Sequence, residues 1–306
     1  MSVAGVHWAF SPLCGLALAP LLLGIVNRTK ACIAGRQGPP LLQPYRDVVK
    51  LLRRGAVYGE ATSPLFRLGP AVTLAALIAG LLLIPFGGAA AAIRFPGDLI
   101  VLVGLLALGR FAIVLAALDT GSSFEGMGAS REMHFAALAE PALLVALATL
   151  TRVTGASDLT GIYKAVSIGA WAHALPSLAL VAITFLILGL VENSRIPVDD
   201  PNTHLELTMI HEVMVLDHSG PDLAAIQYAA AQKLWILGAL FTGLAVPLHG
   251  GNFVLDAAAA LLGMAGLAVV IGMIESAMAR YRLARVPQFI VGAATLSAVG
   301  FIVFLV

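Results

Sequence analysis

Carboxylate side chains are concentrated in one polar stretch that separates two long apolar segments. The stretch has the sequence ENSRIPVDDPNTHLE over residues 192–206, and it continues through His211 and Glu212. Only 11% of the residues in the chain are charged, so this concentration of acids in one loop indicates a physical role. A polar loop at the end of an apolar segment suits either proton transfer or the docking of a soluble partner.

A second group of ionisable side chains lies inside apolar segments. Glu140 is followed by Pro141 in one of them, while Arg110 and Lys233 lie within two others. A charge at the centre of a membrane helix costs on the order of 2.5–3.5 kcal/mol, so it usually faces a bundle interior or a water-filled path. Proline can kink the helix and leave room for water. We therefore expect Glu140 to take up and release protons. Arg110 and Lys233 either belong to the same path or are structural partners of buried acids.

Other acids lie near the predicted ends of apolar segments. Asp119 and Glu192 end two of them, Glu132 precedes a third, and Glu275 ends a fourth. Side chains in these places can extend to the membrane surface without a function, which is the simpler interpretation of Asp119 and Glu275. A series of acids leading into the membrane fits a proton path, and it fits equally well a negatively charged entrance for a cationic ligand. The proton path that we predict includes Asp119 and Lys233.

Several common kinds of site do not fit the sequence. The glycine-rich stretch GSSFEGMG, residues 121–128, lacks a phosphate-binding or dinucleotide-binding pattern and more simply predicts a flexible turn. His211 and Glu212 resemble the start of a zinc-protease motif, but Val215 stands where the second histidine is required. Two cysteines are too few to hold an iron–sulfur cluster, and a net charge of +1 does not favour nucleic-acid binding. We expect no metal and no other cofactor in this chain.

The elements that must position these residues are long apolar segments. Hydrophobic residues make up 59% of the 306 residues, and several runs exceed the roughly 18 apolar residues that cross a bilayer as a helix. We predict an all-α, polytopic membrane protein with one integral-membrane domain over residues 1–306, whose first apolar run is a retained span. About eight spans are expected, near residues 8–27, 64–86, 98–118, 133–151, 171–191, 225–247, 254–275 and 288–306.

The distribution of basic residues predicts the orientation of these spans. Thirteen lysines and arginines fall in the first, third, fifth and seventh loops, against three in the loops between them. Loops rich in lysine and arginine stay in the cytoplasm, so both termini are expected outside.

Two loop segments are predicted to be helical without crossing the membrane. Residues 40–54 place leucine, valine and tyrosine on one face and basic residues mainly on the other, which is typical of an amphipathic interfacial helix. Residues 203–216 begin with Thr203, and Glu206 three positions later completes a capping box. Glu206 is therefore either an acid of the proton path or only a cap for this helix.

Three long motifs in the chain resemble one known family. Residues 35–54, residues 119–133 with the ALAEP sequence at 137–141, and residues 192–212 are similar to the membrane subunit of formate hydrogenlyase and related membrane-bound nickel–iron hydrogenases. That protein is homologous to subunit 1 of respiratory complex I, which contacts the peripheral arm. The resemblance covers nearly the whole chain, and eight spans with outward termini are also what it implies.

The resemblance implies a role as the heel of a hydrogenase complex in a bacterial or archaeal cytoplasmic (inner) membrane. The expected partners are the hydrogenase small and large subunits, a ferredoxin-like iron–sulfur subunit and antiporter-like membrane subunits. The nickel–iron centre and the iron–sulfur clusters would lie in those partners, so this chain would be a non-catalytic subunit of an oxidoreductase. By motif, the implied proton route contains Glu140, Glu192, Glu206 and Glu212. The implied docking residues are Arg36, Arg46, Arg131, Glu132, Arg195, Asp199 and Asp200.

One motif departs from the complex I pattern, which leaves other functions open. Complex I has a sequence of the type APFDLPE where this chain has IPVDDPN, residues 196–202. The difference favours the hydrogenase branch over the alternative of a quinone-binding subunit of an NADH–quinone oxidoreductase-like complex. An independent ion transporter is a third alternative, but the sequence has no obvious pair of inverted halves with broken helices.

Overall fold

The computed structural model describes residues 7–199, 209–247 and 251–305 of the chain. Within these ranges the regular structure is helical, apart from an isolated bridge between Phe86 and Ala89, so the expected all-α class is confirmed. The long helices are α1 (His7–Ile33), α3 (Pro64–Leu83), α4 (Asp98–Asp119), α5 (Ser123–Thr154), α7 (Ile168–Glu192), α8 (Gly220–Ala245), α9 (Phe253–Ala277) and α10 (Val286–Leu305). The short elements are α2 (Gln43–Leu52), α6 (Leu159–Ala165) and the 3-10 turns η2 (Glu212–Val215) and η3 (Leu283–Arg285).

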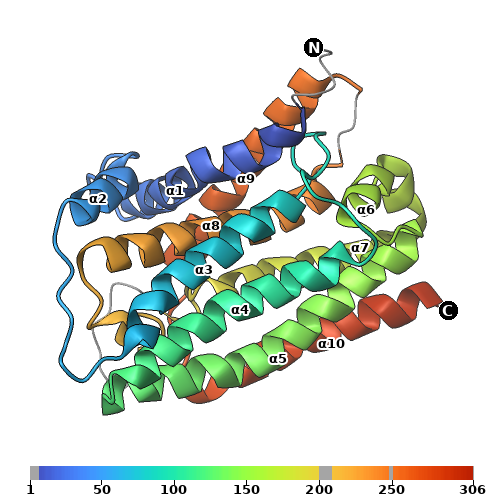
Figure 1. Cartoon of the computed structure of the whole chain (residues 1–306). Helices are drawn as coiled ribbons and strands as arrows, with labels where there is room; N and C mark the ends of the chain where they lie inside the picture. The colour runs from blue at the N-terminus through green and yellow to red at the C-terminus, as the bar shows by residue number, and fades with distance from the viewer. Residues whose placement is uncertain (1–6, 200–208, 248–250, 306) are drawn as a thin grey trace.

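The long helices lie side by side in one bundle, as Figure 1 shows. Each of the expected spans corresponds to one of them, but in the described part of the chain seven, not eight, are both long and apolar enough to cross a membrane. The exception is α8, where Gln227, Gln232 and Lys233 lower the hydropathy. Its residues 231–240 are all buried, so this helix faces other helices and not lipid, and polar residues are tolerated there.

The hydrophobic core lies between the long helices. Leu81 of α3, Leu102 of α4, Leu147 of α5, Leu178 of α7 and Trp235 of α8 are among its most buried side chains. Figure 1 also shows that α1 begins and α10 ends at the same end of the bundle. α8 is one of the long helices of this bundle, although its sequence is more polar.

The start of α3 is held by two side-chain oxygens. Ser63 is the N-cap and accepts a hydrogen bond from the backbone nitrogen of Leu65 at 3.2 Å, with Pro64 in the first helical position. Asp119, at the end of α4, accepts hydrogen bonds through Oδ2 from the backbone nitrogens of Ser63 at 2.7 Å and Phe66 at 3.3 Å. This contact fixes the start of α3 against the end of α4.

The glycine-rich stretch is helical, which corrects the prediction of a flexible turn. Only the residues around Gly121, with a φ of 68°, form the turn, and α5 already begins at Ser123. Gly128 lies inside α5 and faces the loop before α8: a Cβ atom there would be 2.2 Å from Cγ1 of Val213 and 2.9 Å from the carbonyl oxygen of Ile210. Glycine is needed because the loop packs directly on the helix backbone.

The first of the two loop segments is helical as predicted and forms α2, whereas the second differs from the prediction. The interfacial position of α2 stays a prediction. Positions 203–208 lie outside the described residues, and from Met209 onwards the chain forms a 3-10 turn at η2 in place of an α-helix. Asp199 accepts a hydrogen bond from the backbone nitrogen of Ile210 at 3.2 Å, and Arg131 donates to the carbonyl oxygen of Met209 at 2.9 Å. These side chains take the place of helical hydrogen bonds.

Candidate functional site

Five charged side chains meet inside the bundle, and we call them the buried charge cluster: Arg110, Glu132, Glu140, Glu192 and Lys233. Nε of Arg110 lies 3.3 Å from Oε1 of Glu132, and its two terminal nitrogens donate hydrogen bonds to Glu140 and Glu192. Nζ of Lys233 lies 2.9 Å from Oε2 of Glu192. A single guanidinium group therefore binds three carboxylates.

Four helices supply the members of the buried charge cluster. Arg110 comes from the second half of α4, Glu192 is the last residue of α7, and Lys233 lies in the middle of α8. Glu132 and Glu140 both come from α5, and their separation of eight positions places them on one face of the helix. The site is therefore built by packing four helices together.

Burial is deep for most of the cluster. The side chain of Arg110 is 4% exposed, whereas that of Glu140 is 32% exposed and is the most accessible member. With three carboxylates, one arginine and one lysine, the fully ionised cluster carries a charge of −1. An uncompensated buried charge is unfavourable, and Glu140 is the member through which the excess negative charge reaches the surroundings most easily.

His211 is a further neighbour of the buried charge cluster. Its Nδ1 atom lies 3.6 Å from Oε2 of Glu132, and its side chain is about one third exposed. His211 comes directly before η2, and Glu212 is the first residue of that turn. The ring of His211 therefore contacts Glu132 on one side and a large cavity on the other.

Three cavities reach the cluster. The largest, of about 480 Å³, is called the loop cavity and is lined by Glu192, His211, Glu212 and Lys233 together with apolar residues of α1 and α8. A second, of about 50 Å³, is lined by Arg110, His211 and Lys233 among others. A third, of about 10 Å³, lies beside Arg110, Glu132 and Glu192 and has room for about one water molecule. Glu192 therefore borders the loop cavity directly, and His211 lies between that cavity and Glu132.

A separate ionic network ties the loop after α7 to the bundle. The side chain of Glu275 on α9 is fully buried, with Nζ of Lys30 at 2.7 Å from one oxygen and Nη1 of Arg195 at 3.2 Å from the other. The expectation that Glu275 extends to the membrane surface is wrong, because these two cations hold it inside. Nη2 of Arg280 lies 2.8 Å from Oδ1 of Asp199.

The structure brings together some of the predicted proton-path residues and separates others. Glu140, Glu192 and Lys233 belong to the buried charge cluster. Glu212 lines the loop cavity. Asp119, the last residue of α4, accepts hydrogen bonds from backbone nitrogens at the start of α3. Glu206 lies outside the described residues. The path itself stays a prediction.

The predicted docking residues fall into two groups. Arg36 and Arg46 are exposed and Arg131 is half-buried. The others with described positions point inward: Glu132 belongs to the buried charge cluster, while Arg195 and Asp199 bind Glu275 and Arg280 as described above. Asp200 lies outside the described residues.

Sequence reasoning leaves two members of the site without a firm role. It allows Arg110 to be either a path residue or a structural partner, and the structure makes it the hub of the cluster. The signal is present in the sequence, because an arginine inside an apolar helix needs several acids around it. The sequence places His211 in a loop, and only the fold of that loop brings it to Glu132.

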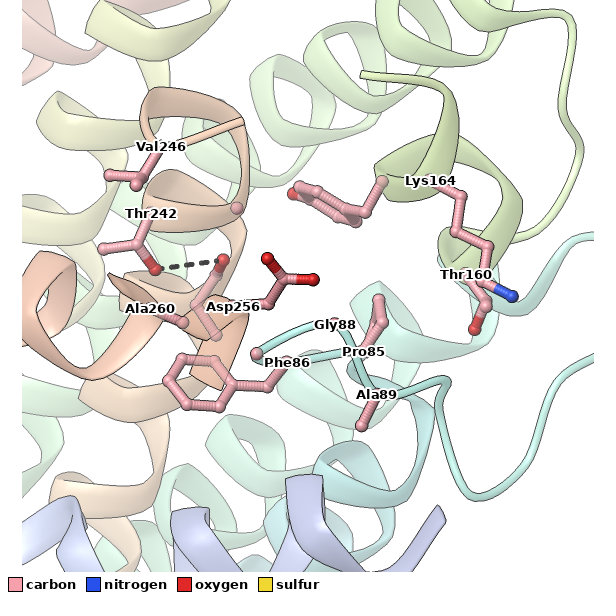
Figure 2. A pocket seen from close by; sticks show the side chains of 14 residues that line it. Pro85, Phe86, Gly88, Ala89, Thr160, Lys164, Thr242, Val246, Asp256 and Ala260 are labelled. Carbon is pink, nitrogen blue, oxygen red and sulfur yellow. Dashed lines mark hydrogen bonds between the residues drawn. The ribbon is translucent and has the colours of Figure 1, made fainter. Parts of the chain in front are cut away.

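A further cavity of about 50 Å³ lies at the other end of the bundle, between α6, α8, α9 and the turn at residues 85–89 (Figure 2). The carboxylate of Asp256 points into it. Thr160 accepts a hydrogen bond from the backbone nitrogen of Ala91 at 3.1 Å. Tyr163 donates to the carbonyl oxygen of Leu240 at 2.7 Å, and burial raises the pKa of this phenol. Thr160 and Tyr163 beside this cavity therefore stabilise the fold through their hydrogen bonds.

The described residues contain no group of three or more His, Cys, Asp or Glu side chains placed to hold a metal ion. The buried charge cluster differs from a metal site, because the cationic side chains of Arg110 and Lys233 lie among its three carboxylates.

Comparisons with known proteins agree with the motifs. A family model described as NADH dehydrogenase matches residues 8–306. Formate hydrogenlyase subunit 4 of Escherichia coli is 32% identical over 279 residues, which cover 89% of each chain. Hydrogenase-4 component C of the same organism is 34% identical over 233 residues, which cover 76% of this chain and 72% of that protein.

More distant similarities extend to respiratory enzymes. The H-type subunit of the NADH-quinone oxidoreductase of Verminephrobacter eiseniae is 28% identical over 219 residues, covering 67% of this chain and 59% of that protein. A chain in the structure of the membrane-bound sulfane sulfur reductase, an archaeal respiratory membrane complex, has the same fold, with a TM-score of 0.82 at 20% identity over 98% of this chain and 99% of that one. The protein therefore belongs to the NADH dehydrogenase family of membrane proteins, and it is more similar to the two hydrogenase-related relatives than to the oxidoreductase protein of Verminephrobacter eiseniae.

Proposed function

We propose that this protein is the membrane-anchoring heel subunit of a formate hydrogenlyase-like hydrogenase complex in a bacterial or archaeal inner membrane. The similarity to formate hydrogenlyase subunit 4 along 89% of the chain supports this proposal. The heel docks a cytoplasmic module through exposed loop residues such as Arg36. The hydrogenase subunits, a ferredoxin-like subunit and the antiporter-like subunits are the partners, and the nickel–iron centre and iron–sulfur clusters belong to those chains.

We further propose that the heel couples electron transfer in its partners to proton translocation. The observation that carries this proposal is the binding of three carboxylates by Arg110 next to the loop cavity. Protons reach the cluster from water in the loop cavity, which Glu192 and His211 line, and Nδ1 of His211 lies 3.6 Å from Oε2 of Glu132. The guanidinium group of Arg110 then links the charge on Glu132 to that on Glu140 and Glu192.

Coupling of electron transfer to proton translocation requires only a modest free energy at this site. Moving one charge across 100 mV takes about 2.3 kcal/mol, so a few kcal/mol for each electron pair must reach this site. A change of charge in a partner chain near the loop cavity alters the field at His211, and the cluster adjusts its bound protons in response. Glu140, as the most accessible carboxylate, passes the change to the next membrane protein of the complex.

The substitution Glu140→Gln tests this role. Glutamine keeps the size and hydrogen-bonding capacity of the side chain but cannot carry a proton, so proton movement linked to hydrogen production should fall at least tenfold. The measurement is acidification or alkalinisation of inverted vesicles during turnover. The matched control is Glu60→Gln, which removes a carboxylate from an exposed loop position.

Assembly is measured in the same preparations by co-purification of the partner chains and by nickel content. We expect the Glu140→Gln complex to retain both. Normal assembly with unchanged proton movement would contradict the coupling role while leaving the anchoring role intact. Recovery of the wild-type chain with flavin-containing, NADH-oxidising subunits and no nickel would contradict the hydrogenase assignment itself.

A second candidate function is that of a quinone-binding subunit of an NADH–quinone oxidoreductase-like complex. The loop cavity favours it, because about 480 Å³ is in the range of small-molecule sites and its walls combine charged residues with apolar ones such as Leu23 and Ile226. Quinone-dependent activity that is lost in an Ile226→Trp variant, which fills the cavity, would support this function. Activity that needs no quinone and survives the substitution would exclude it.

A further inference from the structure

The outward face of α2 combines cations with apolar side chains. Leu42, Arg46, Val49, Lys50 and Arg53 recur at helical spacing and are all exposed, with Leu42 at 54% and Val49 at 47%. We call these five residues the α2 stripe. A groove along the same helix is lined in part by Arg46, Val49, Lys50 and Arg53. Exposed leucine and valine next to cations are typical of helices at a lipid–water boundary.

The cations of the α2 stripe have no anionic partner among the residues that the structure describes. Asp47 is the sole acid of α2, and its Oδ1 accepts a hydrogen bond from Nε2 of Gln43 at 2.7 Å. Arg54 follows directly and adds a further positive charge. Cations that are close together repel one another, so an external anion gains from binding all of them at once.

The helix is attached to the bundle in a fixed position. The hydroxyl group of Tyr45 donates a hydrogen bond to the carbonyl oxygen of Ala17 in α1. At Gly24, farther along α1, a Cβ atom would be 2.1 Å from the carbonyl oxygen of Leu41. These contacts hold α2 beside α1, as Figure 1 shows. The residues of the α2 stripe stay exposed.

We propose that the α2 stripe is a binding site for an anionic phospholipid. The phosphate group lies among Arg46, Lys50 and Arg53, and the acyl chains run along Leu42 and Val49. The charge complementarity and the position beside α1 favour a lipid over a soluble protein, because exposed aliphatic residues next to cations, on a helix packed against a candidate membrane span, are typical of the lipid–water boundary. This assignment gives Arg46 a role in lipid binding in place of docking, and it is independent of the proposed hydrogenase function.

The experiment measures binding of phosphatidylglycerol and phosphatidylcholine to the purified full-length protein, with its co-purifying subunits, by native mass spectrometry over a lipid titration. We compare the wild-type protein with the double variant R46Q/K50Q. The matched control is R282Q/R285Q, which removes two exposed arginines from the loop before α10, predicted to lie on the same side of the membrane.

Wild-type protein should bind phosphatidylglycerol more tightly than phosphatidylcholine. R46Q/K50Q should bind phosphatidylglycerol about 30-fold more weakly, because each cation near an anionic lipid surface contributes roughly a fivefold change in affinity. R282Q/R285Q should stay within about threefold of the wild type, since a single fivefold contribution would already exceed that limit. The charge-conserving variant R46K/K50R should keep the binding, and it separates loss of charge from loss of the fold.

Three results would overturn the proposal. The first is unchanged phosphatidylglycerol binding by R46Q/K50Q, and the second is an equal loss in both double variants. The third is loss of soluble subunits from R46Q/K50Q with lipid binding intact, which would make the α2 stripe a protein-docking surface.

Discussion

Arg110 joins α4 to α5 and α7 through its three carboxylate partners. Buried ion pairs contribute little over a well-packed apolar core, but removing one partner leaves the others unpaired in a poorly solvated place. Loss of Arg110 therefore affects the protein through Glu132, Glu140 and Glu192. Among the described residues, Lys233 would remain as the cation beside Glu192, and His211 as the neighbour of Glu132.

We predict that Arg110→Gln lowers the free energy of unfolding by about 3–5 kcal/mol, the range for breaking a buried ion pair. The measurement is thermal unfolding of the purified protein in a mild detergent. Arg94→Gln removes an exposed arginine from a loop and should leave the unfolding temperature unchanged.

A double variant tests the cause of this effect. Adding Glu192→Gln to Arg110→Gln removes one of the stranded charges, so the two effects should be far from additive and the double variant should be more stable than Arg110→Gln alone. Strict additivity would mean that Arg110 acts through its packing and not through its charge.

His218 is expected to make the stability of the protein depend on pH. Its ring stacks on Phe66 with centroids 3.9 Å apart, and neither ring nitrogen has a hydrogen-bond partner within the described residues. Burial lowers the pKa of His218, against smaller opposing contributions from Asp222 and Asp217. The imidazole is therefore held in its neutral form in the folded protein.

We predict that stability falls as the pH decreases below about 6.5, the ordinary pKa of histidine. Between that value and the lower pKa of the folded state, the unfolded chain binds more protons, so protonation favours unfolding. His218→Phe keeps a ring on Phe66 without a titrating group, and unfolding midpoints from about pH 5 to 8 should decline less with acid. His134→Phe, at an exposed position, is the control and should follow the wild type.

At the scale of elements, the loop before α8 depends on its packing against α5. Gly128 allows this contact, because any side chain there meets Val213 and the Ile210 carbonyl group. The same loop carries His211, so its distance to Glu132 is set by the closeness of loop and helix.

We predict that Gly128→Ala displaces this loop and reduces both stability and proton movement in the complex. Gly104→Ala is the matched control, since it lies in α4 with nothing within 4 Å of the added Cβ atom. Alanine favours helix over glycine by roughly 1 kcal/mol, so the control should be neutral or slightly stabilising in thermal unfolding. Equal effects of both substitutions would argue against the contact.

Local sequence predicted the helices well where burial in lipid decides the structure. The span expected at residues 98–118 is α4, and the amphipathic pattern at residues 40–54 is α2. Local sequence did not predict the structure where side chains from distant parts of the chain determine it. The loop from Met209 forms η2 because Arg131 and Asp199 bind its backbone, and no pattern within the loop encodes those partners.

The site was predictable to a similar degree. Glu140 and Glu192 stood out as acids in apolar surroundings, and both belong to the buried charge cluster. The meeting of Glu132 with Arg110 depends on the packing of α4 against α5. Sequence periodicity gives the face of a helix but not the neighbour that covers it.

At the scale of the whole molecule, the predicted orientation can be tested with the cysteine at the end of α1. Cys32 is exposed, and the positive-inside rule places this end of the helix in the cytoplasm. In a Cys14→Ser background, a membrane-impermeant maleimide should label Cys32 in inverted vesicles and not in intact spheroplasts.

The control for this experiment lies on the opposite side of the membrane. Replacing Cys32 by serine and adding Arg94→Cys should reverse the pattern, with labelling in spheroplasts. Labelling of Cys32 in spheroplasts would mean that both termini face the cytoplasm.

The polar character of α8 has a consequence for the biogenesis of the protein. During synthesis each segment partitions from the translocation channel into lipid according to its own hydrophobicity, and a central lysine opposes this step by on the order of 2.5–3.5 kcal/mol. Lys233 and Gln232 make α8 a poor substrate for insertion alone. The carboxylate of Glu192 on the preceding helix forms an ion pair with Lys233 and offsets that opposition. We therefore expect the segment to enter the bilayer together with α7, with the ion pair of the site also assisting insertion of the chain into the membrane.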